Sequence, residues 1–311
     1  MGAQLRVYRR RIRSVNATKK ITRAMELIAS SRIVKAQQQV AASQPYADAL
    51  YRAVSLSASN ARGDHPLLSR PERLKRAAVL VVTADRGLAG AYSANVLREA
   101  ERLSELLIAE QGVAVSYYVV GRKGVGYLKF RGVDIAQAWT GFSDRPTYED
   151  AKKVAETLLA DFLRPDNQGG VDEIQIVFTR FKNRVSQTPV VLRIVPLVIE
   201  EEVVEAGAPI TTARPHRPVL PLYDFEPSAE RVLDALLPRY IEYLVHSSLL
   251  SAAASEHAAR QRAMKAATEN AEELIRALTR QANQARQAEI TQEISEIVGG
   301  ADALVAVTQG S

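Results

Sequence analysis

The chain contains no cysteine among its 311 residues, which excludes disulfide bonds, thiolate metal sites and cysteine nucleophiles. Aromatic residues make up only 6% of the chain, and Trp139 is the single tryptophan. No apolar run reaches the roughly eighteen residues of a membrane-spanning helix, and the N-terminus lacks the apolar segment of a secretion signal. Together with the abundant alanine, these absences favour helices that pack through small residues.

Glycine and proline are missing from two long stretches, one between Ala3 and Gln44 and one between Pro238 and Gly299. Apolar residues recur there at spacings of three and four, which predicts two long helices. We expect Pro45 to bend the first helix without ending it, and Gly299-Gly300 to stop the second. The predicted stripes are Leu5, Tyr8, Ile12, Val15, Ile21, Met25 and Ile28, and then Leu233, Leu237, Tyr240, Leu244, Met264, Ala267, Ala271, Leu274 and Leu278.

The lengths of these helices predict that they pair. About seventy helical residues form a rod of roughly 105 Å, and the N-terminal helix reaches roughly 80 Å. A compact globule of this chain length has a radius of gyration of only about 20 Å. Both helices must therefore project, and each apolar stripe needs a partner. We predict that they form a long antiparallel coiled coil.

The middle of the chain has the pattern of a layered α/β domain, since short apolar runs alternate with amphipathic segments. The expected strands are 77–83, 113–120, a short one at Ile135, 173–181 and its hairpin partner 190–199; the expected helices follow Gly90 and Gly121 and cover 148–162. The resulting domains are an N-terminal shaft helix 1–62, the α/β domain 75–200, a connector or foot 201–227, a C-terminal shaft helix 228–299 and a tail 300–311.

No catalytic, cofactor-binding or metal site is predicted. The loop after the first strand contains Gly87 and Gly90, but neither it nor any other segment matches the dinucleotide-binding or P-loop fingerprint. The histidines are scattered without metal-ligand spacing, at His65, His216, His246 and His257. A nucleotide-dependent enzyme on the α/β domain remains an alternative, and calorimetry with NAD or ATP would test it.

The net charge of +6 is unevenly distributed. The first thirty-five residues contain ten basic side chains against the single acid Glu26: Arg6, Arg9, Arg10, Arg11, Arg13, Lys19, Lys20, Arg23, Arg32 and Lys35. Such an arm suits nucleic acid, an acidic protein partner or plain solvation. A nucleic-acid-binding or cytoskeletal coiled-coil scaffold is therefore a second alternative, and steep salt dependence of DNA binding would support it.

Three segments resemble the gamma subunit of bacterial F-type ATP synthases. KKITRAMELIASSRIVKAQ (19–37) resembles its N-terminal helix, and AMKAATENAEELI (263–275) with ARQAEITQEISEIVGGADAL (285–304) resembles its C-terminal helix. The loop DRGLAG (85–90) resembles the loop after the first strand of the family's Rossmann-like domain, which implies that fold for the α/β domain here, although Ala89 stands where relatives often have cysteine. The segments follow the family's order over essentially the whole chain.

The resemblance implies a central rotor shaft that couples rotation of the membrane c-ring to conformational cycling of the catalytic beta subunits. One copy would contact the hexamer of alpha and beta subunits, the epsilon subunit and the c-ring, with no active site, cofactor or nucleic acid of its own. The chain would be a peripheral protein on the cytoplasmic face of the cell membrane, and protons are the expected coupling ion.

The same resemblance assigns partner contacts to individual residues. The set expected to face the acidic levers of the beta subunits is Lys20, Arg23, Met25 and Arg32. The set expected to bind a loop of the hexamer is Arg260, Gln287 and Thr291. Tyr223 and Glu226 are expected at the foot that meets the c-ring. Glu272 and Glu273 are expected on a solvated face.

Overall fold

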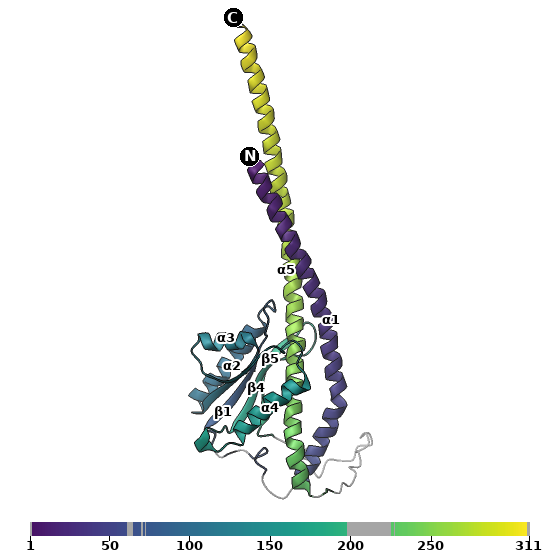
Figure 1. Ribbon diagram of the computed structural model, residues 1–311, viewed down its shortest axis with the longest axis vertical. Helices are drawn as coiled ribbons and strands as arrows, with labels where there is room; N and C mark the ends of the chain where they lie inside the picture. The colour runs from purple at the N-terminus through teal and green to yellow at the C-terminus, as the bar shows by residue number, and fades with distance from the viewer. Residues whose placement is uncertain are drawn as a thin grey trace, which may run out of the picture. The chain divides into compact units, whose positions relative to one another are not determined.

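The computed structural model describes residues 2–60, 65–69, 71, 73–197, 225–226 and 228–309. The chain divides into two compact units: Arg32–Ala258, which we call the α/β unit, and Met1–Ser31 with Ala259–Ser311, which we call the helical unit. Two long helices, α1 (Gly2–Asn60) and α5 (Ala229–Gln309), contribute residues to both units (Figure 1). Within the described residues, no helix is long and apolar enough to cross a membrane.

The α/β unit is built on a five-stranded sheet with the order β3-β2-β1-β4-β5. The strands are β1 (Arg76–Val82), β2 (Ala114–Val120), β3 (Ile135–Trp139), β4 (Glu173–Phe181) and β5 (Gln187–Val195). The first four are parallel, whereas β5 pairs antiparallel with β4 as a hairpin. The predicted Rossmann-like α/β fold is confirmed.

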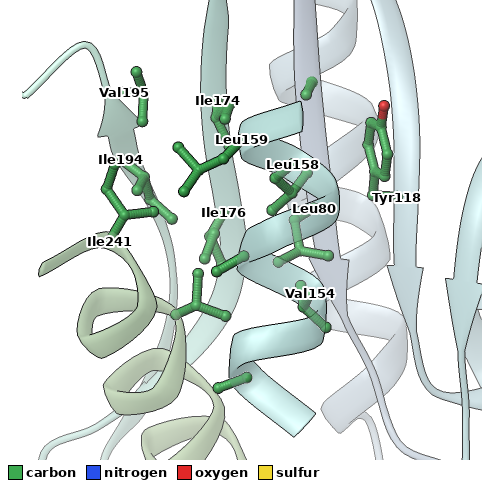
Figure 2. Packing of buried hydrophobic residues seen from close by; sticks show 14 of the residues in the cluster. Leu80, Tyr118, Val154, Leu158, Leu159, Ile174, Ile176, Ile194, Val195 and Ile241 are labelled. Atoms are coloured by element: carbon green, nitrogen blue, oxygen red, sulfur yellow. The ribbon is translucent and has the colours of Figure 1, made fainter. Parts of the chain in front are cut away.

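The two faces of the sheet are buried by different helices. Alternate residues of β1 point to opposite faces, so Leu80 and Val79 belong to separate clusters. The helices α2 (Tyr92–Ala109) and α3 (Arg122–Phe130) lie on the Val79 side. On the Leu80 side, α4 (Tyr148–Phe162) and the first part of α5 pack onto the sheet (Figure 2). A short 3-10 helix, Asp166–Gln168, precedes β4.

The α5 helix sits directly on the sheet in this unit. Leu237, Ile241 and Val245 recur every four residues and are almost completely buried in the same cluster as Ile176 and Ile194. Each fully buried aliphatic side chain of this size contributes about 1.5–3 kcal/mol relative to exposure. The part of α5 within this unit is therefore an integral part of its core.

The C-terminal end of α5 lies beyond the predicted position. Pro45 lies inside α1, as predicted, but the predicted stop at Gly299-Gly300 is wrong because α5 continues to Gln309. A glycine ends a helix most readily when it adopts the left-handed conformation. Gly299 stays in the helix with open space around it, and a helical glycine costs only about 1 kcal/mol relative to alanine.

His246 of α5 makes the stability of the α/β unit depend on pH. Its ring packs edge-on against Tyr148, with centroids 5.7 Å apart, and burial lowers the pKa of His246 below its ordinary 6.5. The unfolded chain therefore binds a proton that the folded chain resists, so the free energy of unfolding falls as the pH drops below 6.5. We expect His246→Phe, which keeps the ring packing, to flatten this slope in urea unfolding between about pH 5 and 8. An unchanged slope would contradict the assignment.

Candidate partner-binding surface of the helical unit

The seam of the helical unit is formed by small and hydroxylated side chains. The hydroxyls of Thr22 and Thr268 lie 2.7 Å apart and share a hydrogen bond, and Lys19 Nζ lies 2.9 Å from Glu272 Oε1. The lower-numbered residue of α1, Lys19, contacts the higher-numbered residue of α5, Glu272. The two helices therefore run antiparallel, as predicted. Ala29 is buried in this unit, which allows the backbones to approach closely.

The predicted stripe of α1 is wrong at Ile21 and Ile28, whereas its earlier members Leu5, Tyr8, Ile12 and Val15 are partly buried. Ile21 and Ile28 were expected at the seam, yet they are 60% and 54% exposed, and Met25 is only partly buried. The buried positions are one residue further on, at Thr22 and Ala29. A search for hydrophobic periodicity predicts that the largest aliphatic side chains are buried. In this seam the buried side chains are instead small, or belong to a threonine whose hydroxyl has a hydrogen-bond partner.

As a result, the helical unit presents many large aliphatic side chains to its surroundings. Those at least 45% exposed are Val7, Ile21, Leu27, Ile28, Leu274, Ile290, Ile294, Ile297 and Val298. Leu274 had been assigned to the apolar stripe, and that assignment is also wrong. Single exposed aliphatics are ordinary, but a series of them on a two-helix unit is typical of a surface that binds another protein, which makes this the candidate surface.

Between residues 283 and 299, no side chain of α5 is buried. Ala282 is the last buried position before this segment, whose residues are exposed or partly exposed. The predicted contact residues Gln287 and Thr291 both lie there and are exposed. Thr291 donates its hydroxyl hydrogen to the carbonyl of Gln287 at 2.9 Å, which satisfies it within the helix. Most side chains of this segment are therefore accessible on the surface of α5.

Basic side chains add a charge to the apolar surface. Lys20 and Arg23 are exposed, and Arg23 Nη1 lies 2.8 Å from Glu26 Oε2. Lys19 donates a hydrogen bond to Glu272 and so lowers the pKa of that carboxyl group. Glu272 is therefore part of the seam and not of a purely solvated face, which corrects that expectation. The exposed arginines of this helix are Arg6, Arg9, Arg10, Arg11 and Arg13.

The remaining predicted contact residues lie in other settings. Arg32 belongs to the α/β unit, where its Nη1 lies 2.6 Å from Asp144 Oδ2. Arg260 is almost completely buried, with 7% exposed, so it offers little surface to a partner. Glu226 is exposed, whereas Tyr223 lies outside the described residues. Arg260 belongs to the helical unit together with Lys20, Arg23, Met25, Gln287 and Thr291, whereas Arg32 and Glu226 belong to the α/β unit. Gln287 and Thr291 lie several helical turns along α5 beyond Thr268, the partner of Thr22, so the two predicted contact sets are not brought together.

The carboxyl edge of the sheet, where Rossmann-like folds hold phosphate groups, carries a side-chain carboxylate instead. Asp85 accepts hydrogen bonds from the backbone N–H groups of Gly141 (2.8 Å), Ser143 (3.0 Å) and Arg122 (3.1 Å). These amides follow β2 and β3, and all three donate to the same carboxylate group. The aspartate therefore supplies the negative charge that a bound phosphate would supply in a nucleotide-binding relative of the fold.

Comparison with known proteins gives the family. A family model described as ATP synthase matches residues 4–304. The ATP synthase gamma chain of Acidothermus cellulolyticus is 62% identical over 306 residues, covering 98% of this chain and 99% of the relative. This chain belongs to the ATP synthase gamma chain family. The gamma chain of Kineococcus radiotolerans is also similar, at 58% identity over 304 residues and 98% coverage of both chains. The resemblance inferred from the motifs is confirmed.

Solved structures share the fold of this gamma chain. A chain of the Euglena gracilis mitochondrial ATP synthase, in a structure of OSCP, F1 and c-ring in rotational state 3, matches with a TM-score of 0.65. The match covers 98% of this chain and 96% of the other at 15% identity. A chain of the Euglena gracilis rotor in rotational state 1 matches with a TM-score of 0.60 over 93% of this chain. At such identities the likeness concerns the fold.

Proposed function

We propose that this gamma chain is the central rotor shaft of a proton-translocating F-type ATP synthase, and that its helical unit turns inside a hexamer of alpha and beta subunits. The observation that carries the proposal is the series of exposed aliphatics on the helical unit, which includes Ile290, Ile294 and Ile297. An apolar surface of this extent needs a cover. A ring of subunits around the two helices would cover it on every side.

The surface of the helical unit is chemically uneven, which is what a rotor requires. A partner changes conformation only if the shaft interacts with its two states by different free energies. Exposed Lys20 and Arg23 would attract an acidic lever of one beta subunit while the neighbouring subunits meet other faces. Near the end of α5, exposed Gln287 would offer its side-chain amide to a hexamer loop. Thr291, whose hydroxyl hydrogen is donated to the Gln287 carbonyl, would offer its hydroxyl oxygen as an acceptor. We leave Arg32 and Arg260 out of these contacts, since one is paired within the chain and the other is buried.

The α/β unit would connect the shaft to the membrane. We infer that a single copy binds the c-ring through the region of Tyr223 and Glu226, on the cytoplasmic face of the cell membrane. For the epsilon subunit, the candidate surface is a groove between α2 and α3, where Ile108 is 57% and Phe130 89% exposed. One proton moved through 100 mV releases about 2.3 kcal/mol, so the shaft must transmit the work of several protons for each ATP.

Reconstitution tests the proposal. The purified chain alone should neither hydrolyse ATP nor bind it, because catalysis would belong to the beta subunits. Mixed with the alpha and beta subunits of a close relative, it should form a complex with one gamma chain per three beta subunits and raise their ATP hydrolysis. If the chain fails to join the hexamer, or hydrolyses ATP by itself, the proposal is refuted.

A further inference from the structure

We propose that a hydrogen-bonded clasp in the α/β unit holds both long helices to the carboxyl edge of the sheet and carries torque from the sheet into the helices. This inference rests on the proposed rotor function. The clasp contains positioning residues that act on the helices and touch no substrate. Its six members are Arg32 of α1, Asp85, Ser143 and Asp144 of the loops, and Glu256 and His257 of α5.

The first half of the clasp joins two loops to α5. The hydroxyl of Ser143 donates to Glu256 Oε2 at 3.1 Å and accepts from the backbone N–H of Asp85 at 2.8 Å. The carboxylate of Asp85 in turn accepts from the N–H groups of Gly141 and Ser143. Glu256 is fully buried and Ser143 is 5% exposed, so water does not compete for these bonds. The loops after β1 and β3 are thereby fixed to each other and to α5.

The second half of the clasp joins the loop after β3 to both α1 and α5 through Asp144, the residue that follows Ser143. Asp144 Oδ2 accepts a charge-assisted hydrogen bond from Arg32 Nη1 at 2.6 Å. The backbone carbonyl of Asp144 accepts from His257 Nε2 at 3.0 Å. The two side chains of the ion pair are mostly buried, at 26% and 15% exposed. One loop, Ser143-Asp144, therefore holds α1 with a side chain and α5 with a side chain and a carbonyl.

The position of the clasp suits the transmission of torque. Arg32 is the first residue of the α/β unit and His257 the last but one, so the clasp acts where the two helices leave this unit. Nearer the start of α5, the contacts with the sheet are made by apolar side chains such as Leu237 and Ile241. Apolar packing is non-directional, whereas hydrogen bonds weaken steeply when their angle changes. A twist of α5 against the sheet would strain the clasp and the two hydrogen bonds that Ser251 and Ser255 make with β4 before it strained the apolar contacts. A twist of α1 would strain the Arg32–Asp144 bond.

A paired replacement in the reconstituted membrane complex tests this role. We expect Ser143→Ala with Asp144→Asn to leave assembly and unloaded ATP hydrolysis unchanged, because neither depends on torque from the sheet. ATP synthesis at a fixed proton-motive force should fall by about two-fold or more. Hydrogen exchange at the amide of Asp85 should accelerate on the order of ten-fold, because its acceptor is removed. Glu156→Gln, which breaks the exposed pair with Lys152 on α4, is the matched control and should change neither.

A second experiment, which exchanges the charges of Arg32 and Asp144, tests the clasp even if the Ser143→Ala, Asp144→Asn variant assembles poorly. Arg32→Asp and Asp144→Arg should each lower synthesis relative to hydrolysis, and the two together should restore it. The clasp is refuted if the paired variant synthesises ATP at the parent rate, or if the exchanged pair performs no better than its single changes. Failure of the parent chain itself to join the hexamer would instead refute the rotor function.

Discussion

Gly121→Ala is expected to lower the free energy of unfolding of this gamma chain by about 3–5 kcal/mol. Gly121 connects β2 to α3 with a φ of +98°, in the region that side chains other than glycine rarely adopt. A Cβ atom there would lie 2.2 Å from the carbonyl oxygen of Thr83. The backbone cannot yield, because the N–H of Thr83 donates to Val120 O and that of Gly121 to Trp139 O, each at 2.8 Å. Urea unfolding of the purified chain measures the loss.

Gly126→Ala provides the matched control within the same helix. Gly126 lies inside α3, and a Cβ atom there would meet nothing within 4 Å. Alanine should therefore raise the free energy of unfolding by about 0.5–1 kcal/mol through its better helix propensity. If the two alanine variants were equally stable, the strained turn at the end of β2 would not have the role assigned to it.

Replacing Ile290, Ile294 and Ile297 by glutamine should leave the chain folded but weaken its binding to the hexamer at least about a hundred-fold. The three side chains are 45–71% exposed in the gamma chain, so their loss removes little from its own core. Glutamine has at least the helix propensity of isoleucine, which keeps α5 intact. If each aliphatic contributes about 1 kcal/mol at the interface, the three together account for the loss. Titration of labelled chain with hexamer measures the affinity, and thermal unfolding measures the fold.

The control for this prediction changes polar residues of the same helix. Gln281→Ala with Gln284→Ala alters two exposed positions without touching an exposed aliphatic. Its affinity should stay within about three-fold of the parent, as is usual for surface substitutions. Equal losses from the polar and the apolar replacements would mean that the end of α5 is not held by apolar contacts.

Several elements could be predicted to the residue because their signals are local. The helix α4 begins after Thr147, whose hydroxyl accepts from the Asp150 N–H while the Asp150 carboxylate accepts from the Thr147 N–H. In β4, the large apolar residues Ile174, Ile176 and Phe178 alternate along the strand. A capping box and an unbroken strand pattern depend only on neighbours in the chain. The α/β fold and the two long helices followed from such signals.

The partner-facing surface was only partly predictable, because it depends on contacts between distant residues. Near Thr22, the side of α1 that faces α5 is fixed by the hydrogen bond to Thr268, 246 positions away in the chain. The local pattern therefore placed Ile21 and Ile28 at the seam, where the structure has Thr22 and Ala29. Arg32 was assigned to an acidic partner subunit, but Asp144, 112 positions away, provides an acid within the chain. The continuation of α5 past Gly299 was missed because composition does not reveal the backbone conformation of a glycine.

Direct observation of rotation is the measurement that tests the rotor function most plainly. The chain has no cysteine, so Val185→Cys, in the exposed turn between β4 and β5, would give a unique attachment point for an optical probe. With the alpha and beta subunits fixed to a surface, addition of ATP should make the probe turn continuously in one direction. A probe that stays at a fixed angle while the same complexes hydrolyse ATP would contradict the rotor function.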